Sequence, residues 1–140
     1  MGCDIHATLE YDWNSNKKKT GNEKWWRAFA RDLDIDRNYQ LFTILAGVRD
    51  TGIRPVIAYN RGVPEDASWE YKDDSEEYGV DGHSHSWVTF DELKNWGVEV
   101  KDSYPSNPEE FRNDDWYKTM EVLADRYGDQ NVRLCFYFDN

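Results

Sequence analysis

The chain is poor in cysteine and contains no long apolar run. Only two of its 140 residues are cysteines, Cys3 and Cys135, which excludes the disulfide-stapled scaffold of many small secreted proteins. No apolar stretch approaches the roughly 20 residues that a membrane-spanning helix needs, and we expect no signal peptide before Cys3. We therefore expect a cytoplasmic protein whose thiols stay reduced.

Basic residues are scarce as well. The chain has 17 lysines and arginines against 28 aspartates and glutamates, which gives a net charge of −11 at pH 7. Binding to nucleic acid or to an anionic membrane requires clustered lysine and arginine, so neither is expected as a direct partner. An excess of carboxylates suits a basic protein partner instead, including a groove built to hold nucleic acid.

Aromatic residues, by contrast, are abundant. They make up 16% of the chain and include seven tryptophans and nine tyrosines. Disordered chains are poor in aromatic residues, so this one is expected to fold. Its length is close to the commonest size of a domain with one hydrophobic core, and we predict a single domain over residues 1–140.

Both ends of the chain have the alternating pattern of a β-strand. The apolar positions of residues 3–11 are Ile5, Ala7, Leu9 and Tyr11. Residues 131–140 alternate in the same way, and the aromatic residues 25–30 are predicted as a returning antiparallel strand. Because each terminal strand needs a partner for its backbone groups, we expect the first and last strands to be neighbours in one sheet.

Capping residues predict where two helices begin. Apolar residues at helical spacing follow Asp36 and Asn38, either of which can cap the first turn. Thr89, followed three residues later by Glu92, matches the capping box, so a second helix is expected to start there. Residues 68–77 are strongly acidic and are predicted as a short exposed helix or loop.

The strongest helix prediction covers Pro108–Tyr127. Asn107 is its expected cap, a stripe of apolar residues follows at helical spacing, and Gly128 ends it. Residues 14–22 and 55–64 are rich in turn-forming residues and are predicted as loops, the second with a strand fragment. Strands at both ends with helices between them predict an α+β fold, in which two to four helices pack a mostly antiparallel sheet.

All three histidines lie in two short polar clusters, one near the N-terminus and one past the middle of the chain. Side chains two residues apart on a strand point to the same face, so Asp4 is expected beside His6. By the same argument, His83 is expected beside His85. We predict that Asp4, His6 and His83 converge in one pocket. The residues expected nearby are Glu10, Ser84, His85 and Ser86. The alternative is that the clusters are loop residues that bind their own backbone.

The spacing in the two clusters resembles metal-binding elements of phosphoesterases, D-x-H in the first and G-H-x-H in the second. The resemblance implies a metal-assisted, phosphoesterase-like hydrolase with a divalent ion such as zinc or manganese. The implied metal ligands are Asp4, His6, His83 and His85. The candidate catalytic residues are His6, His83 and Ser84. The intervening G-D and G-N-H-D/E elements of such enzymes are missing from this chain.

A metal-free site is the alternative. Histidine, serine hydroxyls and arginine can cradle a phosphate, and an indole can stack on a base. The candidate ligand-binding residues are Arg37, Arg49, Arg61, Ser86 and Trp87. A serine hydrolase is a third possibility, although the chain has no G-x-S-x-G elbow.

Six segments carry a resemblance over nearly the whole chain: Met1–His6, Asp36–Phe42, Leu45–Arg49, Arg61–Pro64, His83–Trp87 and Phe138–Asn140. Together they look like a family of small, uncharacterised proteins that occur mainly in bacteriophage and prophage genomes. The resemblance transfers no catalytic residue. It implies a phage accessory role in the host cytoplasm, such as counter-defence.

Two functions of different classes follow. The favoured one is an accessory protein that binds, with or without hydrolysis, a small phosphorylated or nucleotide ligand through the Asp/His/Ser pocket. The alternative is a non-enzymatic acidic inhibitor that blocks a basic, nucleic-acid-binding groove of a host protein. The sequence leaves open the ligand, the presence of a metal and the oligomeric state.

Overall fold

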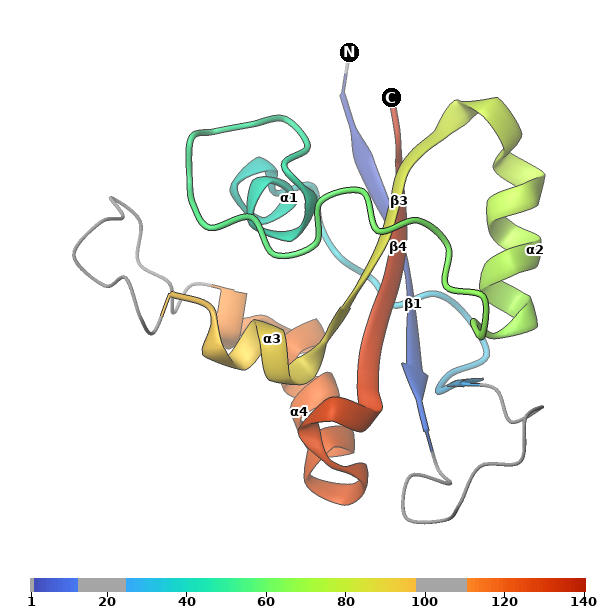
Figure 1. Cartoon of the computed structure of the whole chain (residues 1–140), viewed down its shortest axis with the longest axis vertical. Helices are drawn as coiled ribbons and strands as arrows, with labels where there is room; N and C mark the ends of the chain where they lie inside the picture. Colours follow the sequence, from blue (N-terminus) through green and yellow to red (C-terminus); the bar gives the residue numbers. More distant parts are fainter. Residues whose placement is uncertain (1, 13–24, 98–110) are drawn as a thin grey trace.

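The computed structural model describes residues 2–12, 25–97 and 111–140 (Figure 1). Four antiparallel strands form one open sheet in the order β2-β1-β4-β3. The strands β1 (Asp4–Tyr11) and β4 (Val132–Asp139) pair along their whole length. The first and last strands are therefore neighbours, as predicted, and the α+β fold is confirmed.

The two outer strands flank this central pair. β2 (Trp26–Arg27) is a short edge strand beside β1 and lies within residues 25–30, where the returning strand was expected. β3 (Gly82–Thr89) forms the other edge and pairs with β4. The sequence pattern does not predict β3, because a register shift between His83 and Ser86 disturbs its alternation.

The alternation of β1 and β4 separates a core face from a polar face. The core face carries Ile5, Ala7 and Leu9 of β1, and Val132, Leu134, Phe136 and Phe138 of β4. The polar face carries Asp4, His6, Thr8 and Glu10 of β1, and Arg133, Cys135, Tyr137 and Asp139 of β4. The hydrophobic core therefore lies on one side of the sheet, and the polar side chains of β1 and β4 lie on the other.

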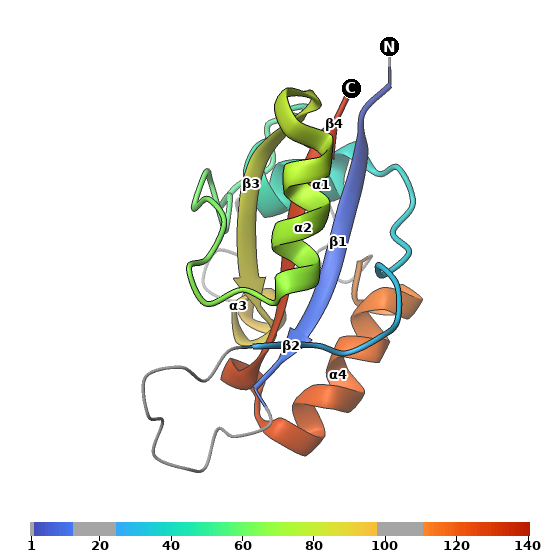
Figure 2. The same ribbon diagram turned by 90° about the vertical axis from the view of Figure 1, so that its right-hand side faces the viewer.

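Helices cover both faces of the sheet. α1 (Tyr39–Ala46), α3 (Phe90–Asn95) and α4 (Asp115–Tyr127) lie on the core face, and α2 (Trp69–Tyr78) covers the polar face (Figures 1 and 2). The buried residue of α2 is Tyr71, whose hydroxyl donates to a backbone carbonyl of β4 over 2.7 Å. Within the described ranges, no helix is both long and apolar enough to cross a membrane.

A buried ion pair fixes the start of α2 to the polar face. The Glu10 carboxylate is fully buried and accepts hydrogen bonds from Nε of Arg133 and from the N–H of Ser68, both over 2.7 Å. The thiol of Cys135 donates to the same carboxylate over 3.2 Å. Ser68 is the N-cap of α2, so the carboxylate lies at the positive end of that helix.

The capping predictions for α1 and α3 are confirmed. Asn38 accepts the N–H of Leu41 over 3.2 Å at the start of α1. Thr89 and Glu92 form a complete, reciprocal capping box at the start of α3. Residues 68–77, for which a short helix or a loop was expected, contain the N-cap and most of α2.

α4 begins later than the sequence predicts. Residues 111–113 form a single 3₁₀ turn, and the α-helix begins only after Asp114. Asp114 has an extended backbone with φ −73° and ψ 148°, which separates the two segments. The helix ends at Gly128, as predicted. The predicted cap Asn107 and the loop at residues 14–22 lie outside the described residues.

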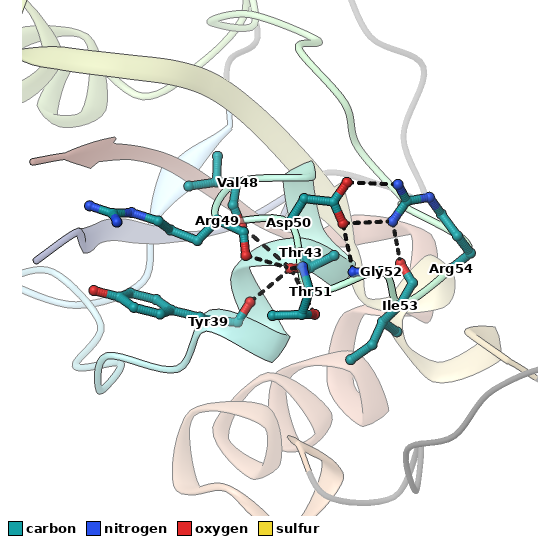
Figure 3. Close-up of polar contacts among 9 residues, drawn as sticks. All are labelled: Tyr39, Thr43, Val48, Arg49, Asp50, Thr51, Gly52, Ile53 and Arg54. Atoms are coloured by element: carbon teal, nitrogen blue, oxygen red, sulfur yellow. Dashed lines mark hydrogen bonds and ion pairs between the residues drawn. The ribbon is translucent and has the colours of Figure 1, made fainter.

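The loop that follows α1 is folded back against that helix (Figure 3). The buried hydroxyl of Thr43 lies 3.2 Å from the carbonyl oxygen of Arg49 and accepts the N–H of Thr51 over 3.0 Å. Asp50 pairs with Arg54 over 2.8 Å. The hydrogen bond from Arg54, followed by one from a backbone N–H, lowers the pKa of Asp50 to about 2. These bonds fix the course of the loop that carries the candidate residue Arg49.

Candidate functional site

The two histidine clusters lie at one end of the sheet, where β1 begins and β4 ends (Figure 1). Asp4 of β1 is opposite Asp139 of β4, and Asp139 is in turn opposite Gly82 of β3. The first cluster therefore lies on β1 and the second on β3, with β4 between them. Neighbouring strands are about 4.8 Å apart, so strand pairing alone brings the clusters into one region.

A β-bulge turns His83 and His85 to opposite faces of the sheet. The register between β3 and β4 shifts after His83, and Ser84 takes a left-handed conformation with φ +56°. The His83 ring stacks on Phe138 of the core face, with ring centroids 6.2 Å apart. The His85 ring stacks on Tyr137 of the polar face at 5.2 Å. The expectation that His83 and His85 share a face is therefore wrong, because the extra residue breaks the two-residue repeat.

His6 lies on the polar face and is hydrogen-bonded to a carboxylate. Its Nε2 is 2.9 Å from Oδ2 of Asp139. The imidazole stacks on Tyr137 at 4.9 Å and lies 4.6 Å from the ring of Tyr78. Burial, followed by the negative charge of Asp139, raises the pKa of Tyr78. Among the described residues, none forms a hydrogen bond with the other ring nitrogen of His6, Nδ1.

A cleft opens beside His6 because the edge of the sheet is interrupted. The N–H of Ala28 bonds the backbone of β1, and so does the N–H of Leu33, each over 2.8 Å. Regular continuation of the β2 register would place Ala30 opposite Ala7, but Leu33 occupies that position. Three extra residues therefore bow outward, and they border an open cleft of about 660 Å³ that we call the His6 cleft.

Groups of both charges line the His6 cleft. Its polar side chains are His6, Arg27, Arg31, Asp32, Asp34 and Asp74. The hydroxyl of Thr8 donates to Asp32 over 3.4 Å. Burial raises the pKa of Asp32, and the negative charge of Asp74 raises it further. The cleft thus combines cationic donors, an imidazole and a carboxyl group that holds its proton more firmly than usual.

Replacing Asp32 by asparagine is expected to stabilise the protein at neutral pH. Because the folded-state pKa of Asp32 is raised above its unfolded value, ionisation of this carboxyl disfavours folding. The melting temperature of Asp32→Asn should exceed that of the parent at pH 7, and the gain should vanish near pH 3, where both states are largely protonated. Thermal melts at both pH values check this, with the neighbouring Asp34→Asn as control. A gain of the same size at both pH values would contradict it.

The predicted metal ligands are engaged separately. The Asp4 carboxylate pairs with Arg37 over 3.0 Å, which lowers the pKa of Asp4. The two ring nitrogens of His83 lie 3.0 Å from Oγ of Ser84 and 3.3 Å from Oδ1 of Asn140. In the described part of the chain, no group of three or more His, Cys, Asp or Glu side chains is placed to hold a metal ion. The structure therefore does not assemble the expected ligand set of Asp4, His6, His83 and His85.

Arg37 and Arg49, two of the predicted ligand-binding residues, do not line the His6 cleft. The guanidinium of Arg37 lies over Gly2, where a Cβ would come within 2.0 Å of it. The guanidinium of Arg49 lies 5.4 Å from the ring centroid of Tyr39. Both arginines therefore make their contacts near the start of β1 and not at the His6 cleft.

Arg61, Ser86 and Trp87 come together at a second place. The N–H of Arg61 donates to Oγ of Ser86 over 3.2 Å, and its guanidinium lies 4.7 Å from the ring centroid of Trp87. The guanidinium also forms two hydrogen bonds to Glu92, of 2.8 and 2.6 Å. Arg61 and Trp87 border a second cleft of about 720 Å³, the Trp87 cleft, which Trp25 and Arg133 also line.

Sequence reasoning missed Asp139, Tyr78 and the carboxyl groups of the His6 cleft. Asp139 had a usable signal, since the alternation of β4 places it on the face of Tyr137 and pairing with β1 brings it near His6. Tyr78 and Asp32 had none. They are brought to His6 by α2 and by the bowed segment, and neither placement is encoded in a local pattern.

Comparison of the chain with protein-family models, with curated proteins and with solved structures gave no match. The site is therefore interpreted from its own chemistry.

Proposed function

We propose that the protein binds a small phosphorylated or nucleotide ligand in the His6 cleft. The observation that carries this proposal is the position of His6, whose ring lines an open cleft while its Nε2 is held by Asp139. Arg27 and Arg31 line the same cleft and offer cationic donors to a phosphate. The carboxyl group of Asp32 suits the hydroxyl and amino donors of a sugar or a base.

The pairing of His6 with Asp139 supports hydrolysis as well as binding. A carboxylate that accepts the Nε2 proton favours the tautomer in which Nδ1 is a proton acceptor. Nδ1 takes a proton from water as the water oxygen attacks phosphorus and the ester bond breaks. The departing oxygen takes its proton from solvent, and exchange with solvent removes the proton that Nδ1 has gained. No other reactant is needed.

The resemblance to phage proteins supports an accessory role in the cytoplasm of an infected cell. Removal of a nucleotide signal by binding or cleavage would blunt a host defence that depends on that signal. Cys3 and Cys135 are both free and buried, in keeping with a reducing compartment.

Thermal shifts with a panel of nucleotides and sugar phosphates test the binding proposal. We expect a phosphorylated ligand that stabilises the parent protein and His83→Ala equally and His6→Ala much less, because His83 stacks on the core face and does not line the cleft. The dephosphorylated form of the same ligand is the chemical control. Equal shifts in the parent and in both variants, or no shift with any member of the panel, would contradict the proposal.

A second candidate is a non-enzymatic inhibitor that blocks a basic, nucleic-acid-binding groove of a host protein. The observation that favours it is α2, where Asp73, Glu76 and Glu77 are exposed and Trp69 is 70% exposed. Such an inhibitor would keep its activity in His6→Ala and lose it when Asp73 and Glu76 are both changed to lysine. The His6 ligand proposal predicts the opposite pattern.

A further inference from the structure

The Trp87 cleft contains alternating indole and guanidinium groups. Cζ of Arg133 lies 4.1 Å from the ring centroid of Trp25 and 5.8 Å from that of Trp87. Cζ of Arg61 lies 4.7 Å from the Trp87 centroid. Indole faces attract cations and pack well against the alkyl stems of long basic side chains. The cleft is therefore built from surfaces that already accommodate arginine side chains.

The two arginines of the cleft are neutralised within the protein. Arg61 forms its bidentate pair with Glu92. Arg133 is buried and pairs with Glu10 over 2.7 Å and with Asp66 over 3.2 Å. Neither guanidinium is left with an unbalanced positive charge that would attract an anion.

Further carboxylates leave a surplus of negative charge at this cleft. Glu65 and Asp91 both line it. Glu65 is exposed, and its carboxylate has no partner among the described residues. Among the described residues, the Asp91 carboxylate accepts a hydrogen bond from the neutral amide of Asn95 over 3.3 Å, and the nearby cation, Lys94, is paired with Asp129 over 3.0 Å. The unneutralised charge of the cleft is thus negative and lies next to indole rings.

We propose that the Trp87 cleft docks an arginine- or lysine-bearing segment of a partner protein. Charge complementarity selects this occupant, because Glu65 and Asp91 can pair with the cationic head while the alkyl stem packs against Trp87. The net charge of −11 favours the approach of such a partner over the whole surface. The inference does not depend on the proposed ligand of the His6 cleft. It rests on the second candidate function in one respect, which is that the partner is a basic protein.

Hexa-arginine and hexaglutamate peptides test the charge preference of the folded, full-length chain. Titration calorimetry should detect binding of hexa-arginine that weakens as salt is raised, and no binding of hexaglutamate. Spermine is the small-cation arm of the same experiment. Spermine that binds as tightly as hexa-arginine would overturn the docking proposal, because the cleft would then be a site for small cations. Absence of hexa-arginine binding at low salt would also overturn it.

Three double variants with the same change in net charge locate the binding site. Glu65→Lys with Asp91→Lys alters the cleft, and Glu121→Lys with Asp125→Lys alters the exposed side of α4. The third variant is Asp73→Lys with Glu76→Lys on α2. We expect the cleft variant to weaken hexa-arginine binding at least about tenfold and the α4 variant less than about twofold.

The remaining outcomes separate the cleft from α2. Equal loss in all three variants would show attraction to net charge alone and overturn the proposal. Loss confined to the α2 variant would also overturn it, while leaving the second candidate function intact. Because Asp91 lies in the first turn of α3, Gln130→Lys is the second test variant. Gln130 is exposed and lines the cleft, and this change should weaken binding without removing a helix-stabilising carboxylate.

Discussion

Replacing Glu10 by alanine is expected to lower the free energy of unfolding by about 3–5 kcal/mol, the typical cost of breaking a buried ion pair. The Glu10 carboxylate is fully buried and accepts from both Arg133 and the N–H of Ser68. Its removal leaves the buried Arg133 with Asp66 as its remaining carboxylate and unpins the start of α2. Denaturant unfolding monitored by tryptophan fluorescence measures the effect.

Two comparisons make the Glu10 prediction specific. Glu121→Ala, on an exposed position of α4, should change stability by less than about 0.5 kcal/mol. The double variant Glu10→Leu with Arg133→Met should be markedly more stable than Glu10→Ala, since no charge is then left buried without its partner. Stability of Glu10→Ala within error of the Glu121→Ala control would show that the ion pair does not hold α2.

Replacing His6 by alanine is expected to reduce hydrolysis of the ligand by about 10²–10⁴-fold, the usual contribution of a general base. This prediction rests on the proposed function. His6 lines the cleft, and Asp139 orients its ring through Nε2. Product release from the phosphorylated ligand that gives the largest thermal shift is the measurement, made at saturating ligand so that weaker binding does not enter the rate.

The neighbouring residues provide the controls for this experiment. Asp139→Asn should lower the rate more than the affinity, because an amide can hold the opposite tautomer of His6 without blocking the cleft. His83→Ala should keep the parent rate, since the bulge directs His83 to the core face. Equal losses in His6→Ala and His83→Ala would contradict the assignment of the base to His6.

Local patterns predicted the elements that depend on local physics. The two-residue alternation of residues 3–11 and 131–140 led to β1, to β4 and to their separate apolar and polar sides. Asn38 and Thr89 marked helix starts because a cap satisfies backbone N–H groups only a few residues away. The start of α4 was predicted too early, since apolar spacing does not reveal the extended backbone at Asp114.

The candidate site depended far more on tertiary structure. The sequence identified His6 and the two polar clusters, but the bulge at Ser84 decided that His83 and His85 point to opposite faces. A bulge is an extra residue relative to a partner strand, so it exists only once β3 and β4 are paired. The cleft beside His6 arises in the same way, from three residues that find no pairing position along β1.

The sequence by itself determined the α+β class, the two terminal strands, the acidic charge and the polar face that carries His6. Only the tertiary structure decided that Asp139 orients His6, that Glu10 and Arg133 lock α2, and that Arg61 joins Trp87 at a second cleft. The physical reason is sequence separation. Periodicity and capping act over a few residues, whereas these contacts join strands and loops far apart in the chain, and the register that sets them is fixed only when the sheet assembles.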